Sequence, residues 1–317
     1  MFQNLPLFPE QASTMAPRVD ALLYFLTAVS IFFASLIFIF IVVFAVKYRR
    51  RSDAEKAPQI EGSIPLEIFW SVVPLGITMV MFIWGALVYF DMSSPPAGAL
   101  EINLVGRQWM WKAQHAEGQS EINELHVPAG LPVRLTMTSE DVIHSYFVPA
   151  FRIKMDVLPA RYTTIWFHPT KAGEYRLFCA EYCGTLHSGM IGRVVVMEPA
   201  DYQRWLGEGA TGTSMAEAGA ELFRRLGCGV CHRASDTGQG PALAGLFGKS
   251  VKLEGGGSAL ADEGYIRESI LEPHAKVVAG FPPVMPTFKG LVSEDGILQI
   301  IAYLKSLRKE ERARAER

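Results

Sequence analysis

The sequence predicts a multi-domain membrane protein with a two-helix transmembrane hairpin, an all-β domain and an all-α domain, in that order. Three observations lead to this prediction. Two long apolar runs lie near the N-terminus, short β-prone segments follow them, and helical patterns return near the C-terminus. Half of the 317 residues are hydrophobic and the mean hydropathy is positive, which soluble proteins of this length rarely reach. The formal net charge of −2 gives no indication of a nucleic-acid partner.

The predicted hairpin covers residues 21–92 and consists of two apolar runs. Residues 21–46 contain no charged side chain, and residues 66–90 contain only Glu67, near the start. A bilayer core of about 30 Å requires roughly 20 helical residues, so both runs are long enough to span it. The alternative, a pair of buried helices in a soluble fold, rarely has such uninterrupted runs. The first run is also too long for the apolar core of a signal peptide, and no basic segment precedes it, so we expect a retained span.

The loop between the two runs indicates the orientation of the hairpin. Five basic residues cluster in this loop: Lys47, Arg49, Arg50, Arg51 and Lys56. Positively charged loops stay on the cytoplasmic side of a membrane. We therefore expect residues 1–20 to form an N-terminal extracytoplasmic segment, and everything after about Asp91 to lie on the same outer side.

The middle of the chain predicts an all-β domain over residues 99–200. A stretch of Ser, Pro, Ala and Gly at residues 93–98 predicts a linker before it. Turn residues then separate five β-prone segments: Ile102–Val105, Val133–Thr138, Thr163–Phe167, Tyr175–Phe178 and Ile191–Met197. Several short strands at this spacing are typical of a β-sandwich or a Greek-key barrel.

The last third of the chain predicts an all-α domain over residues 214–310, followed by a charged tail at 311–317. Helical patterns cover Met215–Leu226 and Ser293–Leu307. Residues 201–213, next to the β domain, contain several Gly, Ala and Thr residues and predict a linker. Such a linker would permit the two domains to dock and undock.

The segment from Cys179 to Met190 places two thiols, an imidazole and a thioether within twelve residues. Such soft ligands favour copper, zinc or iron–sulfur over magnesium or calcium. The second cysteine, Cys183, permits two bridging thiolates and hence two metal ions. A second imidazole is needed besides His187, and His144 is the best candidate because it follows a predicted strand. Zinc held by two Cys and two His, and a disulfide between the cysteines, are the alternatives.

His144 followed by C-x₃-C-x₃-H-x₂-M resembles the dinuclear copper (CuA) motif of cytochrome c oxidase subunit II. The resemblance covers about residues 20–200 and implies a cupredoxin-like Greek-key domain. It also implies two copper ions bound by six residues: His144, Cys179, Glu181, Cys183, His187 and Met190. In the family the two cysteines bridge the ions and the glutamate binds through its backbone carbonyl. The glutamate side chain also reaches a magnesium ion shared with subunit I.

Three further residues resemble functional positions of that family. Trp109, in the segment G-R-Q-W-M-W, matches the tryptophan through which electrons reach the copper. Packing is the alternative, which stays open for Trp111, and Met110 departs from the family's usual Tyr. Glu67 matches a glutamate at the cytoplasmic mouth of a proton channel into subunit I, the alternative being a favourable charge at a helix N-terminus. Asp156 matches an acid near the subunit I boundary, the alternative being a solvated surface residue.

The pentapeptide from Cys228 to His232 has the pattern C-x-x-C-H, which is typical of covalent haem attachment. Cys228 and Cys231 would form thioethers to the haem vinyl groups, and His232 would bind the iron. A thioredoxin-like redox pair is excluded because no βαβ pattern surrounds it.

A Met-Pro pair at Met285 follows this motif at a distance, and together they resemble a class I cytochrome c over about residues 214–308. The resemblance implies that Met285 is the second axial ligand, which raises the reduction potential. Met215 and His274 are the alternative ligands.

The two sites together predict an electron carrier. The resemblance implies subunit II of a cytochrome c oxidase, an oxidoreductase and proton translocase. A haem c accepts electrons from an external donor, a cytochrome or a quinol–cytochrome c reductase. Electrons then pass to a dinuclear copper centre and on to subunit I, where oxygen is reduced to water and protons are pumped. The implied partners are subunits I and III, the donor and membrane lipid. The implied location is the bacterial inner membrane, with both soluble domains on the periplasmic side.

Alternatives from other classes are a membrane-anchored electron carrier without an oxidase partner, a nitrous oxide reductase and a quinol oxidase subunit. A nitrous oxide reductase would need many more than the seven histidines of this chain. A quinol oxidase subunit lacks the copper ligands that are intact here. The electron carrier without a partner stays open.

Overall fold

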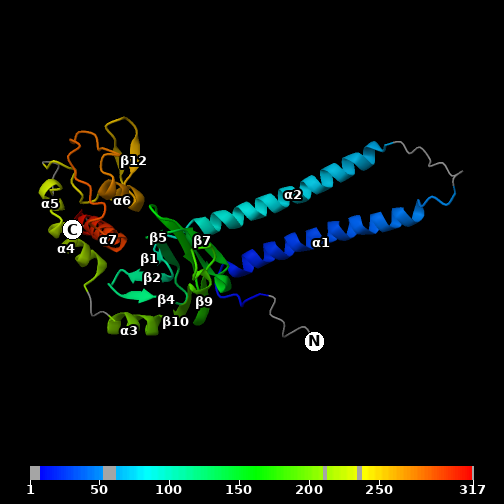
Figure 1. The fold of residues 1–317 in the computed structure, drawn as a ribbon, viewed down its shortest axis with the longest axis horizontal. Coiled ribbons are helices and arrows are strands. Elements are labelled where there is room, and N and C mark those ends of the chain that lie inside the picture. Colours follow the sequence, from blue (N-terminus) through cyan, green and yellow to red (C-terminus); the bar gives the residue numbers. More distant parts are fainter. Residues whose placement is uncertain (1–7, 53–61, 210–212, 234–237, 316–317) are drawn as a thin grey trace. The chain divides into compact units, whose positions relative to one another are not determined.

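The structure, a computed structural model, describes four stretches of the chain: residues 8–52, 62–209, 213–233 and 238–315. The chain divides into two compact units, Thr14–Ser94 and the described residues on either side of it (Figure 1). The first unit is the predicted hairpin. The second contains a β domain, with strands between residues 100 and 197, and a helical domain that begins at Met215.

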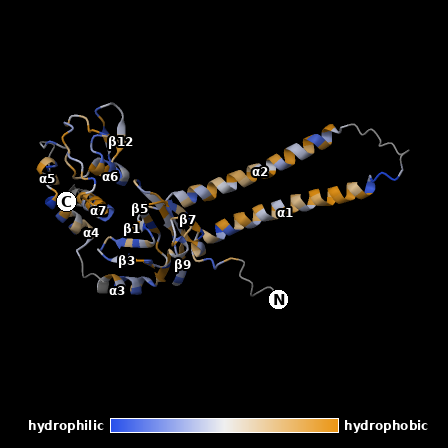
Figure 2. Cartoon of the chain, in the orientation of Figure 1, coloured by the Kyte–Doolittle hydropathy of each residue, from blue (hydrophilic) through white to orange (hydrophobic). Residues whose placement is uncertain are grey.

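Two helices form the first unit, α1 (Ala16–Lys47) and α2 (Ile64–Ser93). Both are apolar along most of their length, as Figure 2 shows, and most of their side chains are exposed. This suits a lipid environment and anchors the chain in a membrane. Each helix has a proline in its first turn, where a missing N–H breaks no helical hydrogen bond. The helices therefore begin before the apolar runs that start at residues 21 and 66.

An ion pair joins the start of α1 to the end of α2. The guanidinium of Arg18 lies 2.6 Å from the carboxylate of Asp91. The two residues are at opposite ends of the hairpin sequence, so the helices run antiparallel. Of the basic loop, Lys56 lies outside the described residues.

Two five-stranded sheets form the β domain, which confirms the predicted all-β fold. The first sheet has the order β3 (Ser120–Ile122), β2 (Met110–His115), β1 (Leu100–Arg107), β5 (Val133–Ser139), β8 (Thr163–Phe167). The second has the order β4 (Glu124–Pro128), β10 (Ile191–Met197), β9 (Gly173–Cys179), β6 (His144–Val148), β7 (Ile153–Val157). Apolar residues on alternate strand positions, such as Leu135, Leu177 and Val194, are buried and form the core.

Residues before α1 are joined to the β domain. Ala12 is fully buried and donates its backbone N–H to the carbonyl of Ala150 at 3.0 Å. The hydroxyl of Ser13 donates to the carbonyl of Phe151 at 2.9 Å. The segment predicted at residues 1–20 is therefore not one piece, because its described part up to Ser13 extends the β domain and its last residues begin α1.

Helix α3 (Pro199–Gly209) follows β10, where the sequence predicts a linker. Tyr202, Trp205 and Leu206 recur at helical spacing, and Tyr202 and Leu206 are buried. The side-chain amide of Gln119 donates to the carbonyl of Leu206 at 2.7 Å. The described part of the predicted linker is therefore a helix fixed to the β domain. Burial of its apolar face stabilises the helix more than its glycines destabilise it.

The helical domain is built from α4 (Met215–Arg225), α5 (Cys228–Cys231), α6 (Glu263–Leu271) and α7 (Glu294–Ala315). Ser214 caps α4 in a reciprocal pair with Glu217. A Cβ at Gly219 would lie 2.0 Å from the carbonyl oxygen of Gln299, so α4 and α7 approach closely only because residue 219 is glycine. The helix α7 continues into the predicted tail.

The predicted all-α domain also contains a short two-stranded sheet, β11 (Ser250–Lys252) and β12 (Ser258–Leu260). It lies in the glycine-rich stretch that has no helical pattern. The turn between the strands contains Gly256 and Gly257, with φ angles of +87° and +86°. Glycine adopts such angles without strain, which permits a hairpin here.

A buried carboxylate holds α3 and two histidines together. Glu121 of β3 accepts hydrogen bonds from Nε2 of His115 at 2.7 Å and from the ring and backbone nitrogens of His126. Nδ1 of His115 lies 3.2 Å from the hydroxyl of Tyr202, and the ring of His126 stacks on Trp205. Burial alone would raise the pKa of Glu121, but the hydrogen bonds of the two histidines outweigh it and lower the pKa from 4.5 to about 2.

We expect Glu121→Gln to lower the free energy of unfolding at pH 7 by on the order of 3 kcal/mol. A carboxylate with a lowered pKa stabilises the folded state fully above its unfolded pKa of 4.5, and this contribution is lost as the pH falls from there toward 2. The variant has no such contribution to lose, so its stability should depend less on pH in that range. Denaturant unfolding of the full chain in detergent measures both effects. The exposed Glu174→Gln is the control, and equal acid sensitivity of wild type and Glu121→Gln would contradict this role.

Candidate metal centres

Adjacent strands of the second sheet bring the first ligands together. His144 begins β6 and Cys179 ends β9, and these strands pair through Tyr146 and Cys179. The backbone N–H of Ala180 donates to the carbonyl of Ser145 at 2.9 Å. The chain after Cys179 is therefore held beside His144.

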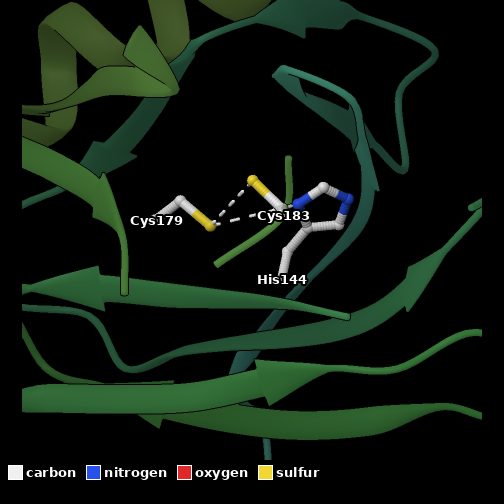
Figure 3. Close-up of side chains that lie close together, drawn as sticks. All are labelled: His144, Cys179 and Cys183. Atoms are coloured by element: carbon white, nitrogen blue, oxygen red, sulfur yellow. Dashed lines mark hydrogen bonds between the residues drawn. The ribbon is translucent and has the colours of Figure 1, made fainter. Parts of the chain in front are cut away.

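Two thiols and an imidazole converge at this point, as Figure 3 shows. Sγ of Cys179 lies 3.8 Å from Sγ of Cys183 and 3.9 Å from Nδ1 of His144. All three side chains are buried. Both cysteines are free thiols, and their sulfurs are much farther apart than the roughly 2.05 Å of a disulfide. The disulfide alternative is therefore wrong.

The other three predicted ligands surround the same sulfurs. Nδ1 of His187 and Sδ of Met190 lie 3.5 Å and 3.8 Å from Sγ of Cys183. The carbonyl oxygen of Glu181 lies 3.3 Å from Sγ of Cys179, while the Glu181 side chain belongs to an exposed residue. Two sulfurs thus lie at the centre with an imidazole nitrogen beside each, a donor set that fits two soft metal ions with bridging thiolates.

The two thiols have very different proton affinities. Burial alone would raise the pKa of Cys179, but hydrogen bonds with His144 and with the backbone lower it to about 6. Burial, followed by the hydrogen bond with Cys179, raises the pKa of Cys183 to about 12. Without metal, one sulfur is therefore a thiolate at neutral pH, which is the form that binds metals.

Asp141 positions the His144 ring, a role that the sequence did not reveal. Its Oδ1 lies 2.8 Å from Nε2 of His144, which keeps the proton on Nε2 and leaves Nδ1 facing Cys179. Its Oδ2 accepts the backbone N–H of Gln108 at 2.7 Å. Burial alone would raise the pKa of Asp141, but the hydrogen bonds from Gln108 and His144 outweigh it and lower the pKa. An acid three residues before a candidate ligand was the available signal.

The turn between β1 and β2 covers the other side of the centre. Nε1 of Trp109 and Nε2 of Gln108 donate to the carbonyl of Cys183 at 3.2 Å and 2.8 Å. Gly184 has a φ of +113°, and a Cβ there would lie 2.9 Å from the Gln108 amide. Trp109 is thus hydrogen-bonded directly to a residue that supplies a candidate ligand.

Trp111 has a different environment from Trp109. It is 1% exposed and lies edge-on to the rings of His144 and Tyr146, with centroid distances of 5.8 Å and 5.3 Å. A Cβ at Gly106 would lie 3.1 Å from the His144 ring. Trp111 is therefore a core residue whose ring packs against the candidate ligand His144.

An apolar cavity in the helical domain contains the second predicted site. Four predicted haem ligands or attachment residues line it: Cys228, Cys231, His232 and Met285. Nδ1 of His232 lies 2.9 Å from the carbonyl of Pro241, which leaves Nε2 free to bind iron. A Cβ at Gly240 would lie 2.7 Å from the same ring, so glycine permits this approach. An apolar cavity lined by two thiols, an imidazole and a thioether fits a covalently bound haem.

The alternative axial ligands lie elsewhere. His274 is exposed and is not among the residues that line the cavity in the described part of the chain. Met215 is buried at the start of α4, where its sulfur accepts a hydrogen bond from the Asn103 amide at 3.4 Å.

The two predicted acids outside the copper motif are placed as follows. Glu67 lies in the first turn of α2 and donates its backbone N–H to the carbonyl of Ser63 at 2.9 Å. Asp156 lies on β7 opposite Ser145, whose hydroxyl donates to it at 2.7 Å. Asp156 is thus linked to the residue next to His144.

Family models match the two soluble domains. The model for the periplasmic domain of cytochrome c oxidase subunit II matches residues 119–198, and the cytochrome c model matches residues 216–308. Cytochrome c oxidase subunit 2 of Alkalihalophilus pseudofirmus is 28% identical over 293 residues, which cover 84% of this chain and 82% of that protein. This chain is therefore similar to cytochrome c oxidase subunit II, with a further cytochrome c domain after the matched periplasmic domain.

Other similar proteins have the same description. Cytochrome c oxidase subunit 2 of Thermostichus vulcanus is 28% identical over 253 residues, covering 63% of this chain and 77% of its own. The periplasmic domain of a cytochrome oxidase subunit II from Bradyrhizobium japonicum, a crystal structure, is 28% identical and covers 37% of this chain and 96% of its own, with a TM-score of 0.35.

These relatives are subunits of cytochrome c oxidase, a haem–copper oxidase. The two matched domain types imply copper and haem binding. The apolar hairpin indicates membrane anchoring, and the match to a periplasmic domain indicates that the soluble part lies on the outer side.

We expect Asp141→Asn to lower the copper affinity of this chain by roughly 10- to 100-fold. An amide cannot accept hydrogen bonds on both of its heavy atoms, so either His144 or Gln108 loses its acceptor. Copper titration of the metal-free full chain against a competing chelator measures the affinity. Glu140→Gln, which changes the adjacent exposed acid, is the control. Equal copper affinity of Asp141→Asn and wild type would contradict the positioning role.

Proposed function

We propose that this subunit II conducts electrons from a haem c in its helical domain to a dinuclear copper centre in its β domain and on to subunit I. The observation that carries this proposal is the convergence of six candidate copper ligands around two free thiols, in one chain with a C-x-x-C-H motif at an apolar cavity. Oxygen reduction to water and proton pumping then take place in subunit I.

The copper centre would be held by residues with distinct parts. The sulfurs of Cys179 and Cys183 are already side by side and would be shared by the copper ions. His144, His187, Met190 and the Glu181 carbonyl would supply the remaining ligands. Such a copper pair would supply one-electron transfer with little change in bond lengths.

The haem would be held by Cys228 and Cys231 through thioethers, with His232 and Met285 as axial ligands. The hydrogen bond from His232 to the Pro241 carbonyl orients the ring toward the cavity. The domains we assign to these functions are residues 99–200 for copper and 214–310 for haem.

The proposal includes four sets of contacts with partners. We assign subunits I and III as the neighbours of the hairpin in a bacterial inner membrane, and a cytochrome or a quinol–cytochrome c reductase as the external donor. The Glu181 side chain, which is exposed, would share a magnesium ion with subunit I. Glu67 would lie at the cytoplasmic mouth of a proton channel into subunit I.

Metal analysis and spectroscopy of the full chain, purified from its native membrane, test this proposal. We expect two copper ions and one covalent haem per chain. The copper EPR signal should show hyperfine splitting shared between two nuclei, and a large haem-bearing subunit should copurify. Zinc at the cysteine site, or a single copper per chain, would refute the proposal.

Trp109 couples the surface to the copper centre through its hydrogen bond to the Cys183 carbonyl. In a chain without haem, made by Cys228→Ser and Cys231→Ser, we expect Trp109→Leu to slow copper reduction by a reduced external cytochrome severalfold, with an unchanged copper EPR spectrum. An aromatic ring couples donor and acceptor better than an alkyl side chain. Stopped-flow absorbance measures the rate. Trp166→Leu, which removes an equivalent ring from β8, is the control, and equal rates in both variants would contradict this role.

A further inference from the structure

A tyrosine of the β domain packs against the hydrophobic core of the helical domain. Tyr162 immediately precedes β8. Its ring packs against a core cluster of α6 and α7 that includes Ile266, Ile300 and Leu304. It also packs against a smaller cluster from both domains: Val105, Met215 and Leu298. The Tyr162 hydroxyl is buried and has no hydrogen-bond partner among the described residues, so its ring, rather than its polar group, makes the contact.

Ion pairs surround this apolar contact. Lys112 of β2 pairs with Asp295 of α7, and Lys305 of α7 lies 2.7 Å from Glu101 of β1. Two further polar contacts join the domains: Arg134 to Glu263 at 3.4 Å, and Arg267 to the carbonyl of Ala160 at 2.8 Å. An apolar centre with a charged rim is the arrangement of a stable interface.

The junction between the domains is held at both of its described ends. Helix α3 is fixed to the β domain by the Glu121 network. At the other end, Met215 is 4% exposed and its backbone N–H donates to the carbonyl of Ala116 at 3.2 Å. Residues 210–212 lie outside the described part of the chain. The described residues on either side of them are held in place, so the prediction of a linker that permits docking and undocking is wrong for these residues.

A continuous series of contacts leads from the haem cavity to His144. Ile266, Ile300 and Leu304 line the cavity on one side and belong to the cluster that contacts Tyr162 on the other. The hydroxyl of Thr163, next to Tyr162, donates to the carbonyl of Asp156 at 2.8 Å. The following residue, Val157, pairs with His144 across β7 and β6.

We propose that Tyr162 fixes the cytochrome domain in one position on the copper domain and that this contact is the path of electrons between them. The proposal rests on the proposed function. In each transfer the helical domain loses one electron and the β domain gains it, while no bond forms and no proton moves. Among the described residues, the hydrogen bonds and ion pairs between the domains do not involve Trp109, which leaves that residue for other donors.

The test is the rate of electron transfer from haem to copper in the full chain loaded with both. A photoreductant reduces the haem in a flash, and copper absorbance follows the transfer. Tyr162→Ala should slow transfer by more than about tenfold, because removal of a buried aromatic anchor shifts the domains toward the undocked state. Tyr162→Phe, which keeps the ring, should transfer at the wild-type rate. The wild-type rate should not depend on ionic strength, because the domains do not separate.

A second readout reports position directly. The ferric haem shortens the magnetic relaxation time of the copper EPR signal when the distance between them is fixed and short. Wild type and Tyr162→Phe should share this effect, and Tyr162→Ala should lose it while it keeps normal haem and copper spectra. If Tyr162→Ala does not fold, Tyr162→Leu keeps an apolar side chain and should show a smaller loss.

Each outcome separates this inference from the proposed function. Normal spectra with an unchanged rate in Tyr162→Ala, or a steep fall of the wild-type rate with ionic strength, would overturn the inference alone. A wild-type chain without the copper and haem spectra would overturn the proposed function and the inference with it.

Discussion

The pairing of β6 with β9 is the contact on which the candidate copper site depends. It places His144, at the start of one strand, beside Cys179, at the end of the other. These residues are far apart in sequence, and a loop alone could not hold them within 3.9 Å. With that pair fixed, the short segment up to Met190 needs only to fold back over it, and its own spacing brings the remaining ligands to the same two sulfurs.

Hydrogen bonds from residues outside the ligand set fix the orientation of the ligands. Asp141 holds the imidazole of His144 and, with its other oxygen, the backbone of Gln108. Gln108 and Trp109 in turn hold the carbonyl of Cys183. The hydrogen bonds form a closed ring around the thiols, so the geometry of the centre and the position of the surface tryptophan are coupled.

The junction of the two soluble domains is also held by a few long-range contacts. The helix α3 uses a buried carboxylate and two histidines to fix the chain as it leaves the β domain. Tyr162 and Met215 then contribute apolar groups to one shared interface. Both described ends of the connection are held, so the proposed transfer between the domains would depend on their packing rather than on diffusion.

Features that depend on local spacing or on segment length could be predicted before the fold was known. The apolar runs predicted the hairpin, twelve residues from Cys179 to Met190 indicated the soft metal site, and five residues from Cys228 indicated haem attachment. Which distant groups meet could be seen only in the folded chain. The partnership of Asp141 with Gln108, the helix within the predicted linker and the position of Tyr162 arise from long-range packing. No local pattern encodes such contacts. From the sequence alone, Asp141 could equally be a surface acid, the helix could be a loop, and Tyr162 could be an ordinary residue at a strand end.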